Sequence, residues 1–113
     1  MNDLTPAQIE IAKAMLEKEL QDNILDAAHK LGWLVHIERP SVNLSGVWST
    51  SIQGDPGFHD DVLSRNGVTL LFELKTETGK LTDEQKEWFM QSHNAYVIRP
   101  RNWLSGEVEE LLK

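Results

Sequence analysis

A glutamate and a lysine lie two positions apart in an apolar segment, Leu71-Phe72-Glu73-Leu74-Lys75, that is typical of a buried strand. Because side chains alternate between the faces of a strand, Glu73 and Lys75 point to one face, roughly 6.5 Å apart along it. Charges among apolar neighbours are costly unless they are paired or bound to a cation. The segment predicts either a functional pair or, as the simpler alternative, an ion pair on an exposed strand face.

A second acidic cluster, Asp60 and Asp61, lies upstream of this segment. An aspartate on a strand paired with the Glu73 strand would complete a pair of carboxylates. Two carboxylates bind Mg²⁺, and a neighbouring lysine orients a water or offsets charge that develops on a phosphate. The combination predicts a metal-dependent phosphodiesterase. Taken alone, either aspartate is also a normal residue for a surface turn.

The elements that must position these residues follow from periodicity and turn chemistry. Thr5, Pro6 and Gln8 open a helix with a capping box, and apolar residues then recur at helical spacing up to Leu31, so one continuous first helix is expected. Asn66-Gly67 favours a tight hairpin. Residues 39–58 have no periodicity and predict a long loop, which is usually functional or mobile. We expect strands over 33–37, 61–64, 68–75 and 95–99, a helix from 82 to about 93, and a short last helix over 104–112.

This order of elements predicts an α/β fold with a mixed sheet. Strands 61–64 and 68–75 form the antiparallel hairpin, and the strand, helix and strand from 68 to 99 form a parallel crossover. A chain of 113 residues with 40% hydrophobic residues predicts a single domain over 1–113 that buries a core.

Composition narrows the class of protein. The chain has no cysteine, which excludes a disulfide framework and a thiolate metal site. It has no signal-peptide pattern and no apolar run of membrane-spanning length, so an intracellular protein without a membrane partner is expected. The net charge of −7 disfavours a protein that coats nucleic acid. A nuclease remains compatible with it, because some of the acids would be metal ligands.

Other residues are candidates with two interpretations each. Glu17 and Glu19 both lie on the first helix, and the helical wheel does not choose between them. Gln85 is the third residue of a capping box opened by Thr82. Trp48, in the long loop, is the best candidate for stacking on a base. The basic residues around the acids either bind phosphate or offset the acidic charge; they are Lys75, Lys80, Lys86, Arg99 and Arg101.

Taken in order, these motifs resemble the VRR-nuc domain of the PD-(D/E)xK nuclease superfamily, in its short stand-alone bacterial and phage form. The resemblance runs from about Leu16 to Trp103. Its pieces are Glu17-Lys18-Glu19-Leu20-Gln21, Leu31-Gly32-Trp33, Gly57-Phe58-His59-Asp60, Glu73-Leu74-Lys75, the run from Gly79 to Trp88 with Gln85, and Tyr96-Val97-Ile98-Arg99-Pro100. His59 replaces the family's proline, and Asp61 replaces an apolar residue. The family pattern favours Asp60 over Asp61 as the functional aspartate.

The resemblance implies a restriction-endonuclease-like sandwich with a mixed central sheet flanked by helices, and a Mg²⁺- or Mn²⁺-dependent DNA endonuclease. Asp60 and Glu73 would be metal ligands, with the backbone carbonyl of Leu74 as a third oxygen. Lys75 would position or activate the attacking water. Glu17 would supply a further carboxylate, and Gln85 would orient Lys75 or the water.

The same resemblance implies a homodimer that acts on branched DNA such as four-way junctions, in the cytoplasm of a bacterium or a phage-infected cell. The dimer interface is expected at the first helix or at the 39–58 loop. Two alternatives remain open. One is a catalytically degenerate nuclease fold that binds DNA or protein, and the other is a restriction-type nuclease with a specific duplex site. The small size, without a separate recognition domain, disfavours the second.

Overall fold

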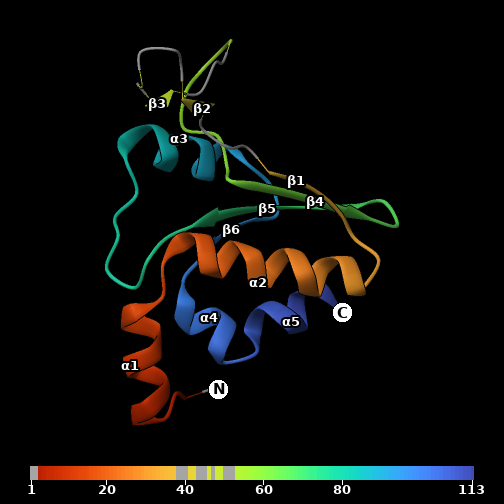
Figure 1. Ribbon diagram of the computed structural model, residues 1–113. Coiled ribbons are helices and arrows are strands. Elements are labelled where there is room, and N and C mark those ends of the chain that lie inside the picture. Colours follow the sequence, from red (N-terminus) through yellow and green to blue (C-terminus); the bar gives the residue numbers. More distant parts are fainter. Residues whose placement is uncertain (1–2, 38–40, 43–45, 47, 50–52) are drawn as a thin grey trace.

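The computed structural model describes residues 3–37, 41–42, 46, 48–49 and 53–113 (Figure 1). The described helices are α1 (Pro6–Ala14), α2 (Glu17–Lys30), α3 (Asp83–Gln91), α4 (Pro100–Leu104) and α5 (Glu107–Leu112). The described strands are β1 (Leu34–Ile37), β2 (Ser41–Val42), β3 (Trp48–Ser49), β4 (Asp61–Arg65), β5 (Val68–Leu74) and β6 (Ala95–Ile98). The fold is therefore mixed α/β.

The central sheet has four strands in the order β1-β4-β5-β6. β1 and β5 are both antiparallel to β4, whereas β5 and β6 are parallel. Asn66 and Gly67 adopt positive φ angles of 51° and 81°, as the predicted hairpin turn requires. Both the hairpin and the parallel strand-helix-strand unit are thus confirmed.

Helices lie on both faces of the sheet. Figure 1 shows α2, α4 and α5 along one face and α3 on the other. The buried core lies between the first group of helices and the sheet. It includes Leu20, Ile24 and Ala28 from α2, Leu63 and Phe72 from the sheet, and Val108 and Leu112 from α5. Burial of this apolar surface is the main term that holds α2 against the sheet.

The prediction of one continuous first helix is wrong. Met15 and Leu16 both have extended backbones, with ψ angles of 127° and 156°, and they separate α1 from α2. Met15 is buried in the core, whereas Leu16 is 61% exposed. The helical spacing of apolar residues continues across the break, so the pattern does not reveal it. Packing of Met15 against the core decides where the first helix ends.

Two other boundaries differ from the predictions. The segment expected to be a loop over 39–58 contains a short antiparallel pair, β2 with β3. Pro100, expected only to end a strand, is the first residue of α4, where its fixed φ and missing N–H are tolerated. Gly106, at φ 86°, then separates α4 from α5. Within the described ranges, no helix is long and apolar enough to cross a membrane.

Candidate functional site

The start of β4 places Asp60 beside β5. The β4–β5 register begins at Asp61, which lies opposite Phe72, so Asp60 lies just beyond the ladder. Its Oδ2 accepts a hydrogen bond of 2.8 Å from the backbone N–H of Leu74. The side chain thereby takes the place of a strand partner. Asp60 is held next to Glu73, and we call these two residues the carboxylate pair.

Glu73 is a buried carboxylate that accepts no hydrogen bond from the described residues. Only 2% of the residue is exposed, and neither Oε1 nor Oε2 has a hydrogen-bond partner among the residues that the structure describes. Burial, and after it the negative charge of Asp60, raise the pKa of Glu73 to about 8. Burial likewise raises the pKa of Asp60. Two negative charges here are unfavourable unless a proton or a cation compensates them.

Lys75 extends from the same strand face as Glu73. Its Nζ lies 3.9 Å from Glu73 Oε1, and its side chain is 13% exposed. The positive charge of Lys75 lowers the pKa of both members of the carboxylate pair, although burial outweighs it. The predicted convergence of Asp60, Glu73 and Lys75 is thus seen in the fold.

Glu17, the first residue of α2, faces this group. Burial raises its pKa, and the charges of Lys75 and Asp60 act on it next. The charge of Glu17 in turn raises the pKa of Glu73. The structure therefore selects Glu17 over Glu19 as the glutamate of the first-helix motif that lies near the carboxylate pair.

Asp61 is a site residue that sequence reasoning set aside in favour of Asp60. It is 1% exposed, and its Oδ1 accepts a 2.8 Å hydrogen bond from Gln21 Nε2 on α2. Its Oδ2 has no partner in the described part of the chain, and burial raises its pKa to about 6. The alternation of side chains along a strand could have predicted its burial, because Asp61 shares the core-facing side of β4 with Leu63.

Gln85 forms the capping box of α3 with Thr82. Its Oε1 accepts from the N–H of Thr82 at 2.9 Å, and its own N–H donates to Thr82 Oγ1 at 3.2 Å. The capping-box interpretation is confirmed. Among the hydrogen bonds of the described residues, none joins Gln85 to Lys75.

The side chains of Lys80 and Lys86 are exposed. The backbone of Trp48 lies in β3, but its side chain falls outside the described part, so its role stays a prediction.

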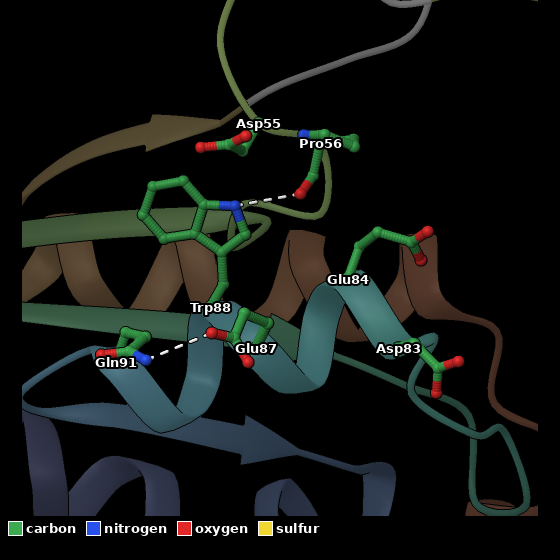
Figure 2. Close-up of a pocket in the computed structure, with 7 residues that line it drawn as sticks. All are labelled: Asp55, Pro56, Asp83, Glu84, Glu87, Trp88 and Gln91. Atoms are coloured by element: carbon green, nitrogen blue, oxygen red, sulfur yellow. Dashed lines mark hydrogen bonds between the residues drawn. The ribbon is translucent and has the colours of Figure 1, made fainter.

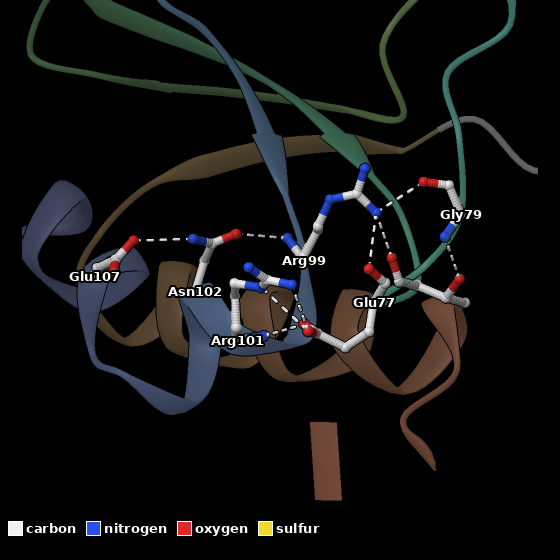
Figure 3. Close-up of polar contacts among 7 residues, drawn as sticks. Glu77, Gly79, Arg99, Arg101, Asn102 and Glu107 are labelled. Carbon is white, nitrogen blue, oxygen red and sulfur yellow. Dashed lines mark hydrogen bonds and ion pairs between the residues drawn. The ribbon is translucent and has the colours of Figure 1, made fainter. Parts of the chain in front are cut away.

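Arg99 and Arg101 have partners within the protein (Figure 3). One guanidinium nitrogen of Arg99, Nη1, donates to the backbone carbonyls of Thr76, Glu77 and Gly79 at 2.7, 3.4 and 2.8 Å. Arg101 forms an ion pair with Glu77, 3.0 Å from Nη2 to Oε2. Both arginines therefore fix the loop that follows Lys75. The ion pair of Arg101 matches the interpretation that these basic residues offset acidic charge, whereas the bonds of Arg99 to backbone carbonyls were not predicted.

A separate pocket lies between α3 and the segment that precedes Phe58 (Figure 2). Trp88 forms part of its lining and donates from Nε1 to the carbonyl of Pro56 at 3.0 Å. Its other lining residues include four acids, Asp55, Asp83, Glu84 and Glu87. Neither member of the carboxylate pair is among the lining residues that are described. An acidic lining repels phosphate, so a nucleic-acid backbone is expected to avoid this pocket.

The carboxylate pair fits a divalent cation in its chemistry. No group of three His, Cys, Asp or Glu residues arranged for a metal is found where the structure describes the chain. Mg²⁺, however, usually keeps several waters and uses only one or two carboxylates. The orphaned, buried oxygens of Glu73 beside Asp60 match that requirement.

Comparisons with protein-family models, with curated proteins and with solved structures find no match. Site geometry is therefore the basis for assigning a function.

Proposed function

We propose that the protein is a Mg²⁺- or Mn²⁺-dependent DNA endonuclease with a restriction-endonuclease-like fold of the VRR-nuc type. The observation that carries this proposal is the buried Glu73 carboxylate next to Asp60, whose two oxygens lack hydrogen-bond partners among the described residues. A buried carboxylate without hydrogen bonds is costly, and groups with strongly shifted pKa values cluster at functional sites. The four-stranded mixed sheet with helices on both faces is compatible with this fold.

Each residue near the pair has a role that follows from its chemistry. Asp60 and Glu73 would hold the cation, with the carbonyl of Leu74 as a further oxygen. Bound Mg²⁺ would act as a Lewis acid on the phosphate and lower the pKa of a bound water. Lys75, beside Glu73, donates to the attacking water or to a phosphate oxygen. Gln85 is a weaker candidate for orienting that water, because its Oε1 belongs to the capping box.

The proposed substrate is DNA, with branched DNA such as a four-way junction as the first choice. The proposed assembly is a homodimer, because a two-fold-symmetric junction suits two symmetric active sites. Ile11 and Leu16, 52% and 61% exposed near the α1–α2 break, support an interface there. Light scattering at tens of micromolar tests the dimer, and a monomer would contradict it. The proposed location is the cytoplasm of a bacterial or phage-infected cell.

The decisive experiment measures cleavage of duplex, flap and four-way-junction DNA with Mg²⁺ and with EDTA. Wild type should cleave at least one of these only with Mg²⁺. Asp60→Asn and Glu73→Gln should each lose on the order of 100-fold or more in rate, because each removes a metal ligand. The matched control is Glu109→Gln, which neutralises an exposed acid on α5 and should cleave as wild type does.

Two outcomes would contradict the proposal. Equal cleavage by wild type and Glu73→Gln would assign the activity to another site or to a contaminant. Mn²⁺ binding without cleavage of any DNA form would favour the alternative, a degenerate nuclease fold that binds DNA or protein.

A further inference from the structure

The hydrogen bond between Gln21 and Asp61 joins α2 directly to β4, next to Asp60. Gln21 Nε2 donates to Asp61 Oδ1 at 2.8 Å, and Asp61 is 1% exposed. A hydrogen bond from a neutral amide to a buried carboxylate is among the stronger kinds in proteins. This contact therefore fixes one side of α2 against the strand that begins at the carboxylate pair.

The first turn of α2 has few other anchors. Its N-cap, Leu16, makes no side-chain capping bond and is 61% exposed. The residues before it are extended, so α1 does not continue the helix and set its direction. Leu20 is fully buried and holds the helix at the sheet. A leucine contact is adaptable in direction, whereas a hydrogen bond between two fixed groups is directional.

Glu17 lies one turn before Gln21, on the same side of the helix. The electrostatic coupling of Glu17 with Lys75 and Asp60 depends on this side facing β5. A small rotation of α2 about its axis would move the Glu17 carboxylate away from Lys75 and Asp60.

We infer that Asp61 is a positioning residue that acts through Gln21. It fixes the rotation of the first turn of α2, so that Glu17 faces the carboxylate pair and adds negative charge to the cation site. This inference rests on the proposed function and extends it to two residues outside the pair.

The test measures Mn²⁺ affinity by calorimetry without DNA, and cleavage separately. Asp61→Leu keeps the branched shape and removes the acceptor, whereas Asp61→Asn keeps an acceptor oxygen and removes the charge. Gln21→Leu removes the donor without changing any charge. The matched control is Gln91→Leu, which removes an exposed hydrogen bond of the same type, from Gln91 Nε2 to Glu87 Oε1. Circular dichroism and thermal unfolding establish that each variant is folded.

We expect Glu17→Gln, Asp61→Leu and Gln21→Leu to weaken Mn²⁺ binding by a similar factor, about 3- to 10-fold. Gln91→Leu should bind as wild type does, and Asp61→Asn, which keeps a neutral acceptor, should lose less affinity than Asp61→Leu. The double variant Glu17→Gln with Asp61→Leu should bind Mn²⁺ no more weakly than either single variant. Asp61→Leu acts by displacing the Glu17 charge, which Glu17→Gln has already removed. A merely structural Asp61 would instead give additive losses.

The Gln21 side-chain amide gives an independent readout by nuclear magnetic resonance. Its resonances should shift less from their wild-type positions in Asp61→Asn, which keeps the acceptor, than in Asp61→Leu. Wild-type Mn²⁺ affinity in Asp61→Leu, or equal losses in Asp61→Asn and Asp61→Leu, would overturn the inference. Mn²⁺ binding that follows the expected series, without cleavage by wild type, would overturn the nuclease proposal and support the positioning role. Absence of Mn²⁺ binding by wild type would overturn both.

Discussion

Asp60 and Leu74 are joined by a 2.8 Å hydrogen bond in which the backbone N–H of β5 donates to a carboxylate from the start of β4. The bond closes the end of the β4–β5 ladder, and it places a second acid beside Glu73. The same contact thus completes the local backbone pairing and brings two carboxylates together, whose negative charges repel each other.

Stability of the metal-free protein should fall as the pH rises from about 5 to about 8. The pKa of Glu73 in the folded state is about 8, above its ordinary value of 4.5, so the folded state keeps a proton that the unfolded state releases. Stability decreases with pH wherever the folded state binds more protons. Each pKa unit corresponds to about 1.4 kcal/mol, so a loss of a few kcal/mol is expected. Urea unfolding in EDTA at several pH values measures it.

Glu73→Gln is the control for this pH dependence. The amide cannot ionise, so the variant should lose much less stability over the same range and should be more stable than wild type at pH 8. Addition of Mg²⁺ at pH 8 should stabilise wild type and leave Glu73→Gln unchanged. Parallel curves for the two proteins would show that Glu73 is not the source.

Lys75→Ala should separate chemistry from metal binding. The lysine side chain is mostly buried beside Glu73, but an ammonium group is not a metal ligand. Cleavage should fall by about 100- to 10,000-fold, the range for loss of a group that handles protons. Mn²⁺ affinity should stay the same or rise, since a positive charge is removed. Lys30→Ala, which breaks an exposed ion pair with Asp26, should change neither quantity. Loss of Mn²⁺ binding in Lys75→Ala would indicate a structural role instead.

Divalent cations should raise DNA affinity. The net charge of −7 and the carboxylate pair repel phosphates, and Ca²⁺ neutralises the pair without efficient hydrolysis. A mobility-shift titration on four-way-junction DNA should therefore show tighter binding in Ca²⁺ than in EDTA. Lys80→Gln and Lys86→Gln should each reduce the slope of log affinity against log salt by about 1, if each contacts one phosphate. Identical affinity in Ca²⁺ and EDTA would argue against a metal site that faces DNA.

Arg99 should contribute more to stability than Arg101. Arg99 donates to three carbonyls of the loop after Lys75, and charged hydrogen bonds of this kind contribute about 1.5 to 3 kcal/mol. Arg99→Ala should therefore cost about 2 to 3 kcal/mol, and Arg99→Lys should recover only part, because lysine lacks the planar fork. The side chain of Arg101 is 58% exposed, so Arg101→Ala should cost under about 1 kcal/mol. Equal losses in urea unfolding would contradict this division.

Local rules of the sequence were sufficient to predict the centre of the sheet and the shared face of its charged residues. The Asn66-Gly67 turn and the alternation of strand side chains predicted the hairpin and the shared face of Glu73 and Lys75, and both are present. The capping boxes at Thr5 and Thr82 are also confirmed. These features depend on residues close together in the chain, where backbone geometry and hydrogen bonding leave few alternatives.

Only the tertiary structure decided the remaining features. The helix break at Met15, the bond from Gln21 to Asp61, the choice of Glu17 and the internal role of Arg99 all depend on contacts between distant parts of the chain. A helical pattern gives the period of α2 but not its rotation against the sheet. Likewise, the sequence does not show whether a basic residue contacts a phosphate or a loop carbonyl. Packing sets these outcomes, because it selects which polar groups lose water and must then find partners.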